Sequence, residues 1–327
     1  MHDPATPAPT KPLPWPLTAV AGLCMGTADA VPGVSGGTIA LVLGVYHRLI
    51  DSIGVFLKAP LHLRSAEGRT RLFAALRFLV PLGIGVVVAY WVGTRILVGP
   101  SETKGLLRRE ETAPLCYAFF FGLVLFSLRE PWQRIAKVDA RCYIAAVVAG
   151  VVTAWAVGLE HAQREPETWM LLYGGALAIA VMLLPGISGS LMLLVIGQYT
   201  AITTAIHDLT GDGDRGAALG RVGVFLLGIA LGLAIFIPIL RGLLKNHRDV
   251  TLAALTGLMA GSLRALWPWK SHYDIKDLDA GHMANVGIGP NWPWVLLFTA
   301  LGALAVWLLR RLERRIEKAE ASKEGAA

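Results

Sequence analysis

Charged residues are scarce in this sequence, and residues that could build a metal site are scarcer still. Only 16% of the 327 residues are Asp, Glu, Lys or Arg, whereas 54% are hydrophobic. An ordinary soluble domain, with about 25% charged residues, is therefore excluded. The cysteines form no Cys-x-x-Cys pair and the eight histidines show no metal-ligand spacing, so we expect no disulfide framework, metal or cofactor. Cys24, Cys116 and Cys142 lie in or beside apolar segments and are expected to serve packing.

The net charge of +7 also gives no sign of nucleic-acid binding, because the basic residues are spread between apolar segments. Residues 1–15 lack the charged start and the cleavage site of a secretory signal. We therefore expect them to form a disordered tail, and residues 311–327 to form a charged tail at the other end.

Apolar segments that could enter or cross a bilayer recur along the whole chain. Four of them come as two pairs, each joined by a Pro-Gly break, and we interpret the pairs as re-entrant hairpins over 16–57 and 169–207. Six others predict membrane spans, at 72–98, 112–128, 141–159, 217–243, 248–266 and 292–310. The sequence thus predicts an all-α polytopic membrane protein.

The charges of the loops support this arrangement. With both hairpins re-entrant, one side of the membrane holds 58–77, 129–141, 241–249 and 310–324, with 18 Lys and Arg against 8 Asp and Glu. The other side holds 98–113, 159–169, 207–216 and 266–291, with 7 basic against 12 acidic residues. By the positive-inside rule the first side is cytoplasmic, so we predict that both termini lie in the cytoplasm.

The two breaks are copies of one another. Residues 32–46 read PGVSGGTIALVLGVY, and residues 185–199, 153 positions later, read PGISGSLMLLVIGQY without a gap. Broken backbone in lipid must be buried in protein or line a cavity, because its unpaired polar groups are costly. Matched interruptions in two halves of a chain indicate the substrate site of a transporter.

A second repeat follows each hairpin. Residues 122–132 read GLVLFSLREPW, and residues 257–267 read GLMAGSLRALW. Each half then consists of a hairpin and three spans, over 16–159 and 169–310. Because three is an odd number, the second half must be inverted relative to the first, as in many secondary transporters.

The hairpin tips combine flexible backbone with hydroxyl groups. Glycines let main-chain N–H groups face a ligand, and the start of the following helix favours an anion. Glycines that only permit tight turns, with serines that cap helices, are the alternative explanation for one tip. A facing pair of tips favours phosphate binding. The candidates are Gly33, Ser35, Gly36, Gly37 and Thr38 in the first tip, and Gly186, Ser188, Gly189 and Ser190 in the second, with Pro32 and Pro185 as the helix breakers.

Three charged residues add to this site. Arg129 and Arg264 occupy the same position of the second repeat, where a guanidinium could bind phosphate or could extend to the lipid headgroups. Asp29 precedes the first break, and Met182 takes its place in the second. An intramembrane carboxylate suggests a proton or sodium coupling site, with a helix cap or a contact to the other tip as the alternative. Arg48 and Asp51, one turn apart, are expected to pair locally.

An enzyme is not expected. Residues 33–37 match the Gly-x-Ser-x-Gly pattern of hydrolases, but their flanks are membrane helices, and neither tip contains a histidine. Two alternatives to lipid transport stay open, namely transport of a small soluble anion and a lipid-binding scaffold that transports nothing.

The stretch GTADAVPGVSGGTIALVLGVYHRLI at 26–50, with LLPGISGSLMLLVIGQY and GLMAGSLRALWPW, resembles the bacterial and archaeal family of undecaprenyl-phosphate (polyprenyl-phosphate) translocases. The resemblance covers nearly all of the chain after the N-terminal tail. It implies a transporter of the cytoplasmic membrane that returns the carrier lipid from the outer to the cytoplasmic leaflet for peptidoglycan and other envelope synthesis. Through the shared motif it implicates Asp29, Pro32, Gly33, Ser35, Gly36, Gly37 and Thr38, and Pro185, Gly186, Ser188, Gly189 and Ser190.

Overall fold

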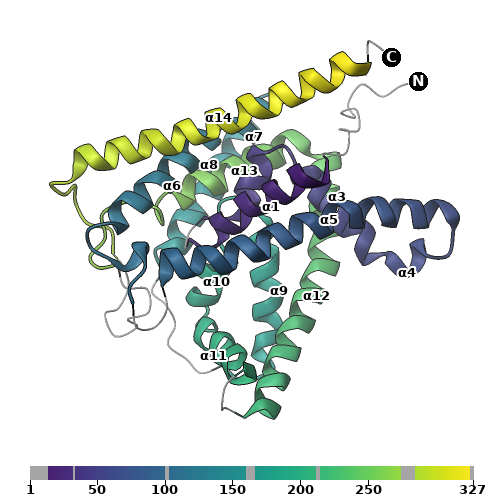
Figure 1. The fold of residues 1–327 in the computed structure, drawn as a ribbon, viewed down its shortest axis with the longest axis horizontal. Coiled ribbons are helices and arrows are strands. Elements are labelled where there is room, and N and C mark those ends of the chain that lie inside the picture. The colour runs from purple at the N-terminus through teal and green to yellow at the C-terminus, as the bar shows by residue number, and fades with distance from the viewer. Residues whose placement is uncertain are drawn as a thin grey trace.

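The computed structural model describes residues 14–31, 34–99, 103–159, 166–210, 214–273 and 284–324, with side chains as far as 311. These residues form helices and no multi-residue β-strand (Figure 1). The first half contains α1 (Trp15–Asp29), α2 (Gly36–Val42), α3 (Tyr46–Leu57), α4 (Ala59–His62), α5 (Ala66–Gly93), α6 (Ala113–Ser127), α7 (Arg129–Gln133) and α8 (Ala140–Val157). The second half contains α9 (Met170–Leu183), α10 (Gly189–Val195), α11 (Tyr199–Thr210), α12 (Arg215–Asn246), α13 (Arg248–Ser262) and α14 (Trp292–Glu324). A π-helical turn η1 (Thr94–Val98) extends α5, and a short 3-10 helix η2 (Leu106–Arg108) precedes α6.

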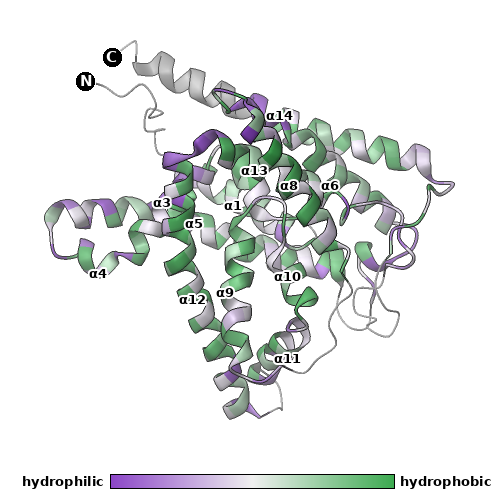
Figure 2. Ribbon diagram, turned by 180° about the vertical axis from the view of Figure 1, so that it is seen from behind, coloured by the Kyte–Doolittle hydropathy of each residue, from purple (hydrophilic) through white to green (hydrophobic). Residues whose placement is uncertain are grey.

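The helices correspond in order to the predicted hairpins and spans, which confirms the all-α membrane fold. Five helices or continuous helix pairs are long and apolar enough to cross a bilayer, and the number rises to seven if each bent pair is one span. The predicted span at 248–266 corresponds to α13, which has 15 residues and is too short to be counted among them. Figure 2 shows apolar residues along the long helices. Val87 of α5, Val151 of α8 and Ile235 of α12 are each more than 60% exposed. Lipid covers such surfaces in a membrane protein.

Helices of the two halves pack in matching pairs. Within each half, the first hairpin arm packs along the first span, α1 along α5 and α9 along α12. The second span of each half packs on the third span of the other, α6 on α14 and α13 on α8. At both of these crossings, the glycine of the second repeat lies against backbone: a Cβ on Gly122 would overlap the carbonyl of Thr299, and one on Gly257 that of Ala146. Small residues let membrane helices approach this closely.

The returning arm of each hairpin is not the single helix that the sequence predicted. Instead of one segment over 36–57, α2 ends at Val42 and the chain bends by 118° into α3. In the second half α10 and α11 meet at 113°. Gly44 and Gly197 lie at these bends with φ of 68° and 72°, a left-handed conformation that costs other residues about 1–2 kcal/mol.

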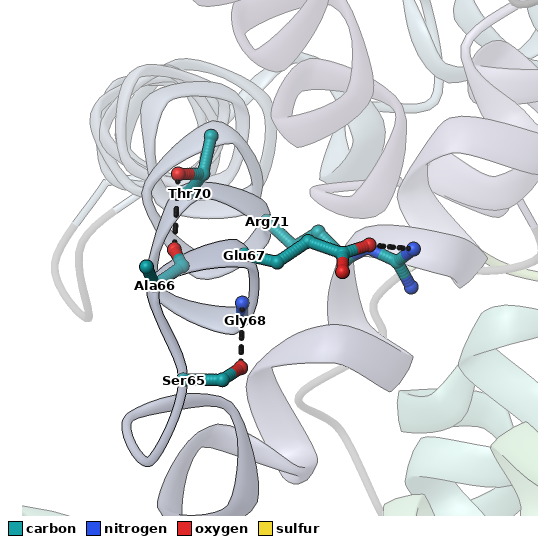
Figure 3. A network of polar contacts seen from close by, with 6 residues as sticks. All are labelled: Ser65, Ala66, Glu67, Gly68, Thr70 and Arg71. Carbon is teal, nitrogen blue, oxygen red and sulfur yellow. Dashed lines mark hydrogen bonds and ion pairs between the residues drawn. The ribbon is translucent and has the colours of Figure 1, made fainter.

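The start of α5 is fixed by its own side chains (Figure 3). The Ser65 hydroxyl accepts a hydrogen bond from the N–H of Gly68 at 3.0 Å, and Arg71 pairs with Glu67 at 2.6 Å. A serine in this position satisfies one of the free N–H groups at a helix start. Together with α4, this turn forms an arm that projects from the body on the same side as the C-terminal end of α14 (Figure 1).

The local pair expected between Arg48 and Asp51 is wrong. Asp51 instead pairs with Arg241 of α12 at 2.9 Å, and the Arg48 guanidinium lies 4.5 Å from the centre of the Phe78 ring on α5. The sequence could not show this, because α3 packs against α5 and α12, which offer both side chains better partners than each other.

Candidate functional site

The two hairpin tips contact each other directly. The Ser35 hydroxyl lies 3.3 Å from the carbonyl oxygens of Met182 and Leu184, and the N–H of Gly186 donates to the Thr38 hydroxyl at 2.9 Å. Tyr46, which is fully buried, donates its hydroxyl to the carbonyl of Leu183 at 2.9 Å. Hydroxyls of the first tip therefore satisfy backbone groups that the second Pro-Gly break leaves without helical partners.

Side chains of the first hairpin cap the start of α2. Asp29 Oδ1 accepts from the N–H of Gly36 at 2.6 Å, and Ser35 accepts from the N–H of Gly37 at 3.1 Å. A Cβ on Gly36 would collide with the Asp29 carboxylate, so a side chain there would displace this carboxylate from the start of α2. Asp29 thus caps α2, which is the alternative that the sequence left open for it. Pro32 and Gly33 lie outside the described residues.

The second tip has no such cap. Met182 takes the place of Asp29, and no side chain accepts a hydrogen bond at the start of α10. Ser188 and Ser190 lie with their hydroxyl oxygens 2.7 Å apart, and Ser188 is 4% exposed. Gly186 has φ of +99° and its Cα faces the backbone of Met259, so a side chain would be strained and crowded here. Pro185 and Gly189 are buried at the same turn.

The two repeated arginines do not join the tips. Arg129 is exposed at the start of α7 and, with the Gln133 amide suitably oriented, donates to its oxygen at 2.7 Å. Arg264 is exposed beyond the end of α13 and donates to the carbonyl of Ala154 at 2.8 Å. No hydrogen bond joins either arginine to a tip among the described residues.

Glu130 and Lys270 are among the buried charged residues that the sequence analysis missed. Glu130, 1% exposed, forms an ion pair with Arg310 of α14. Lys270, 9% exposed, lies in the connection between α13 and α14. Both stand within a few residues of the repeated Ser-Leu-Arg positions, but the repeat keeps neither residue and so gives no signal for them. No group of acidic, histidine and cysteine side chains that could hold a metal ion occurs among the described residues.

Comparisons with known proteins agree with this architecture. The model of a family described as undecaprenyl phosphate translocase-like matches residues 25–284. A protein of Vibrio cholerae named polyprenyl-phosphate transporter is 36% identical over 258 residues, covering 77% of this chain and 78% of its own length. One of the same name from Staphylococcus aureus is 31% identical over 266 residues, covering 77% of this chain and 86% of its own. No solved structure gives a significant match.

Proposed function

The chain belongs to the undecaprenyl phosphate translocase-like family, and we propose that it transports polyprenyl phosphate across the cytoplasmic membrane of a bacterium. In this proposal the carrier lipid undecaprenyl phosphate moves from the outer to the cytoplasmic leaflet, where envelope synthesis uses it again. The observation that carries the proposal is the contact between two buried, hydroxyl-bearing hairpin tips. A phosphate headgroup needs polar partners inside the bilayer, whereas its prenyl chain can stay in lipid.

The internal repeat suggests where the headgroup binds. At the first tip, an anionic oxygen of Asp29 lies against the N–H of Gly36. The matching place at the second tip holds Met182, and no side chain accepts a hydrogen bond from the backbone at the start of α10. Ser188 and Ser190 flank this place, and when one hydroxyl donates to the other, one O–H remains free to donate to phosphate. In this proposal the phosphate binds at the start of α10 and accepts a hydrogen bond from the backbone N–H of Gly189.

The contacts of the first tip suggest how access alternates. Ser35 and Thr38 now bind the backbone of the second tip, so their hydroxyls become available to the phosphate only when the tips separate. A proton or sodium ion at Asp29 would weaken the hydrogen bond to Gly36 and loosen the first tip. Ion binding would in this way couple to separation of the tips, and the phosphate would pass between them.

Leaflet exchange of a polyprenyl phosphate in liposomes that contain the purified protein tests this proposal. Replacing both Ser188 and Ser190 by Ala is expected to slow exchange at least tenfold. Thr203→Ala, an exposed hydroxyl on α11, is the matched control and should leave exchange unchanged. Undiminished exchange in the double variant would remove the proposed site. Uptake of inorganic phosphate without lipid exchange would favour a transporter of soluble anions.

A further inference from the structure

The connection between α13 and α14 contains a short β-bridge, which we call the clamp. Lys270 and Asn285 form an antiparallel bridge, flanked by hydrogen bonds from Ser271 N–H to the carbonyl of Ala284 at 2.8 Å and from Val286 N–H to that of Trp269 at 3.0 Å. The loop charges predict this connection to be on the outer side of the membrane. The clamp holds the ammonium of Lys270 over the Tyr117 ring of α6.

Among the described residues, the partners of the Lys270 ammonium are all neutral. Its Nζ donates to the carbonyl of Ala265 at 2.9 Å and to Oδ1 of Asn285 at 2.8 Å, and it lies 5.5 Å from the centre of the Tyr117 ring. No carboxylate lies within ion-pair distance of it among the described residues. An ammonium has three N–H donors, so one remains for a further partner. A buried charge is costly unless an opposite charge accompanies it.

The surroundings add positive charge and an unused hydroxyl. Burial, and then the nearby guanidinium of Arg264, lower the pKa of Lys270 to about 8. Asn285, which accepts from Lys270 through Oδ1, donates through Nδ2 to the backbone carbonyl of Arg264 at 2.9 Å. The Tyr117 hydroxyl is buried and has no hydrogen-bond partner in the part of the chain that the structure describes. Two neighbouring cations and a free hydroxyl are the components of a phosphate site.

We propose that Lys270 and Arg264 form an outer anion site that binds the phosphomonoester headgroup before it reaches the hairpin tips. The inference rests on the proposed function and adds a second phosphate-binding site to it. The phosphate supplies the negative charge that Lys270 lacks, and it accepts the remaining N–H of the ammonium and donors of Arg264.

Binding to the full chain in detergent tests the site, with farnesyl phosphate as the lipid probe, inorganic phosphate as the soluble probe and farnesol as the uncharged control. Lys270→Met is expected to weaken farnesyl phosphate binding at least tenfold, and Lys270→Arg much less. Lys245→Met, an exposed lysine at the end of α12, should bind as the wild type does. Equal binding by wild type and Lys270→Met overturns the inference. Equal affinity for both phosphate probes would assign the site to free phosphate and overturn its role for lipid.

A second variant separates binding from folding. Asn285→Asp would place a carboxylate beside the Lys270 ammonium, so the site would carry its own counter-ion. This variant is expected to fold yet to lose phosphate affinity at least tenfold, which a purely structural lysine would not show. Farnesyl phosphate binding that survives Asn285→Asp in folded protein also overturns the inference.

A pH series gives a readout that depends on the ammonium itself. The titratable and charged groups near Lys270 are Arg264 beyond α13, Tyr117 on α6, Tyr273 in its own loop, and Glu110, whose charge acts on Tyr273. Burial, and then the charge of Glu110, raise the pKa of Tyr273 further from neutrality. Affinity should therefore fall as pH rises through about 8 in the wild type, but not in Lys270→Arg. A wild-type protein that fails to exchange lipid in liposomes would refute the proposed function, whereas normal exchange and binding by Lys270→Met would refute this site alone.

Discussion

At the scale of single residues, the arginine of the first Ser-Leu-Arg motif and the glutamate that follows it have opposite environments. Arg129, which the repeat singled out, is exposed, whereas Glu130 is buried against Arg310. The repeat gave no indication that Glu130 is buried, because Ala265 occupies the matching position in the second half. The five residues of α7 are too few to show a helical period, so the sequence could not tell which of the two charges faces inward.

The ion pair leads to a stability prediction. Glu130→Gln removes the negative charge beside Arg310, and breaking a buried pair costs about 3–5 kcal/mol. We expect the low end of this range, because the Arg310 side chain keeps 18% of its surface exposed. Thermal unfolding in detergent should show a clearly lower Tm for Glu130→Gln and almost none of this loss for Arg129→Gln. A Tm equal to that of the wild type would mean that the pair contributes nothing.

At the scale of helices, the sequence predicted breaks where proline marks them and missed breaks marked by glycine alone. The Pro-Gly breaks were expected from steric rules that hold for any chain. The bends after α2 and α10 occur at Gly44 and Gly197, which are a matched pair in the repeat. Glycine is also common in straight membrane helices, so its presence does not distinguish a bend from a close packing contact. Only the packing of α3 against α5 and α12 settles which of the two occurs.

The matched helix crossings give a prediction with a built-in comparison. Gly122→Ala and Gly257→Ala each place a methyl group against the backbone of the opposing helix, Thr299 of α14 or Ala146 of α8. Because backbone cannot rotate away, each variant should lower stability by about 1–3 kcal/mol through overpacking. Gly223→Ala in α12, where a Cβ meets open space, should be neutral or slightly stabilising. Melting temperatures of the three variants test this. A loss in only one half would show that the two crossings are not equivalent.

At the scale of the whole molecule, the repeat predicted the helices of each half but not that helices of one half pack on helices of the other. Sequence identity over the tips and the Ser-Leu-Arg motifs shows that the halves match. It carries no information that α6 packs on α14 and α13 on α8, because such pairing depends on shape along whole helices rather than on any short motif. Because of these contacts between the halves, each half completes the helix packing of the other.

Orientation in the membrane is a prediction that labelling can test. Leu61, in the arm around α4, and Ile288, before α14, are 61% and 70% exposed. The loop charges put the arm in the cytoplasm and Ile288 outside. In a chain without its native cysteines, Leu61→Cys should resist an impermeant thiol reagent added to intact cells, and Ile288→Cys should react. The reverse pattern would invert the topology and the proposed direction of entry.

A cross-link between the tips tests whether transport requires them to separate. Ser35 Oγ lies 3.3 Å from the backbone carbonyl oxygen of Leu184, so positions 35 and 184 are adjacent, and cysteines there in a chain lacking Cys24, Cys116 and Cys142 are the pair to cross-link. Under oxidation we expect lipid exchange in liposomes to fall at least tenfold, because alternating access needs two arrangements of the tips. Reduction should restore it, and each single-cysteine variant should be insensitive to the oxidant. Exchange that continues at full rate through the cross-linked protein would show that the tips act as one rigid unit, so that the headgroup would have to pass beside them rather than between them.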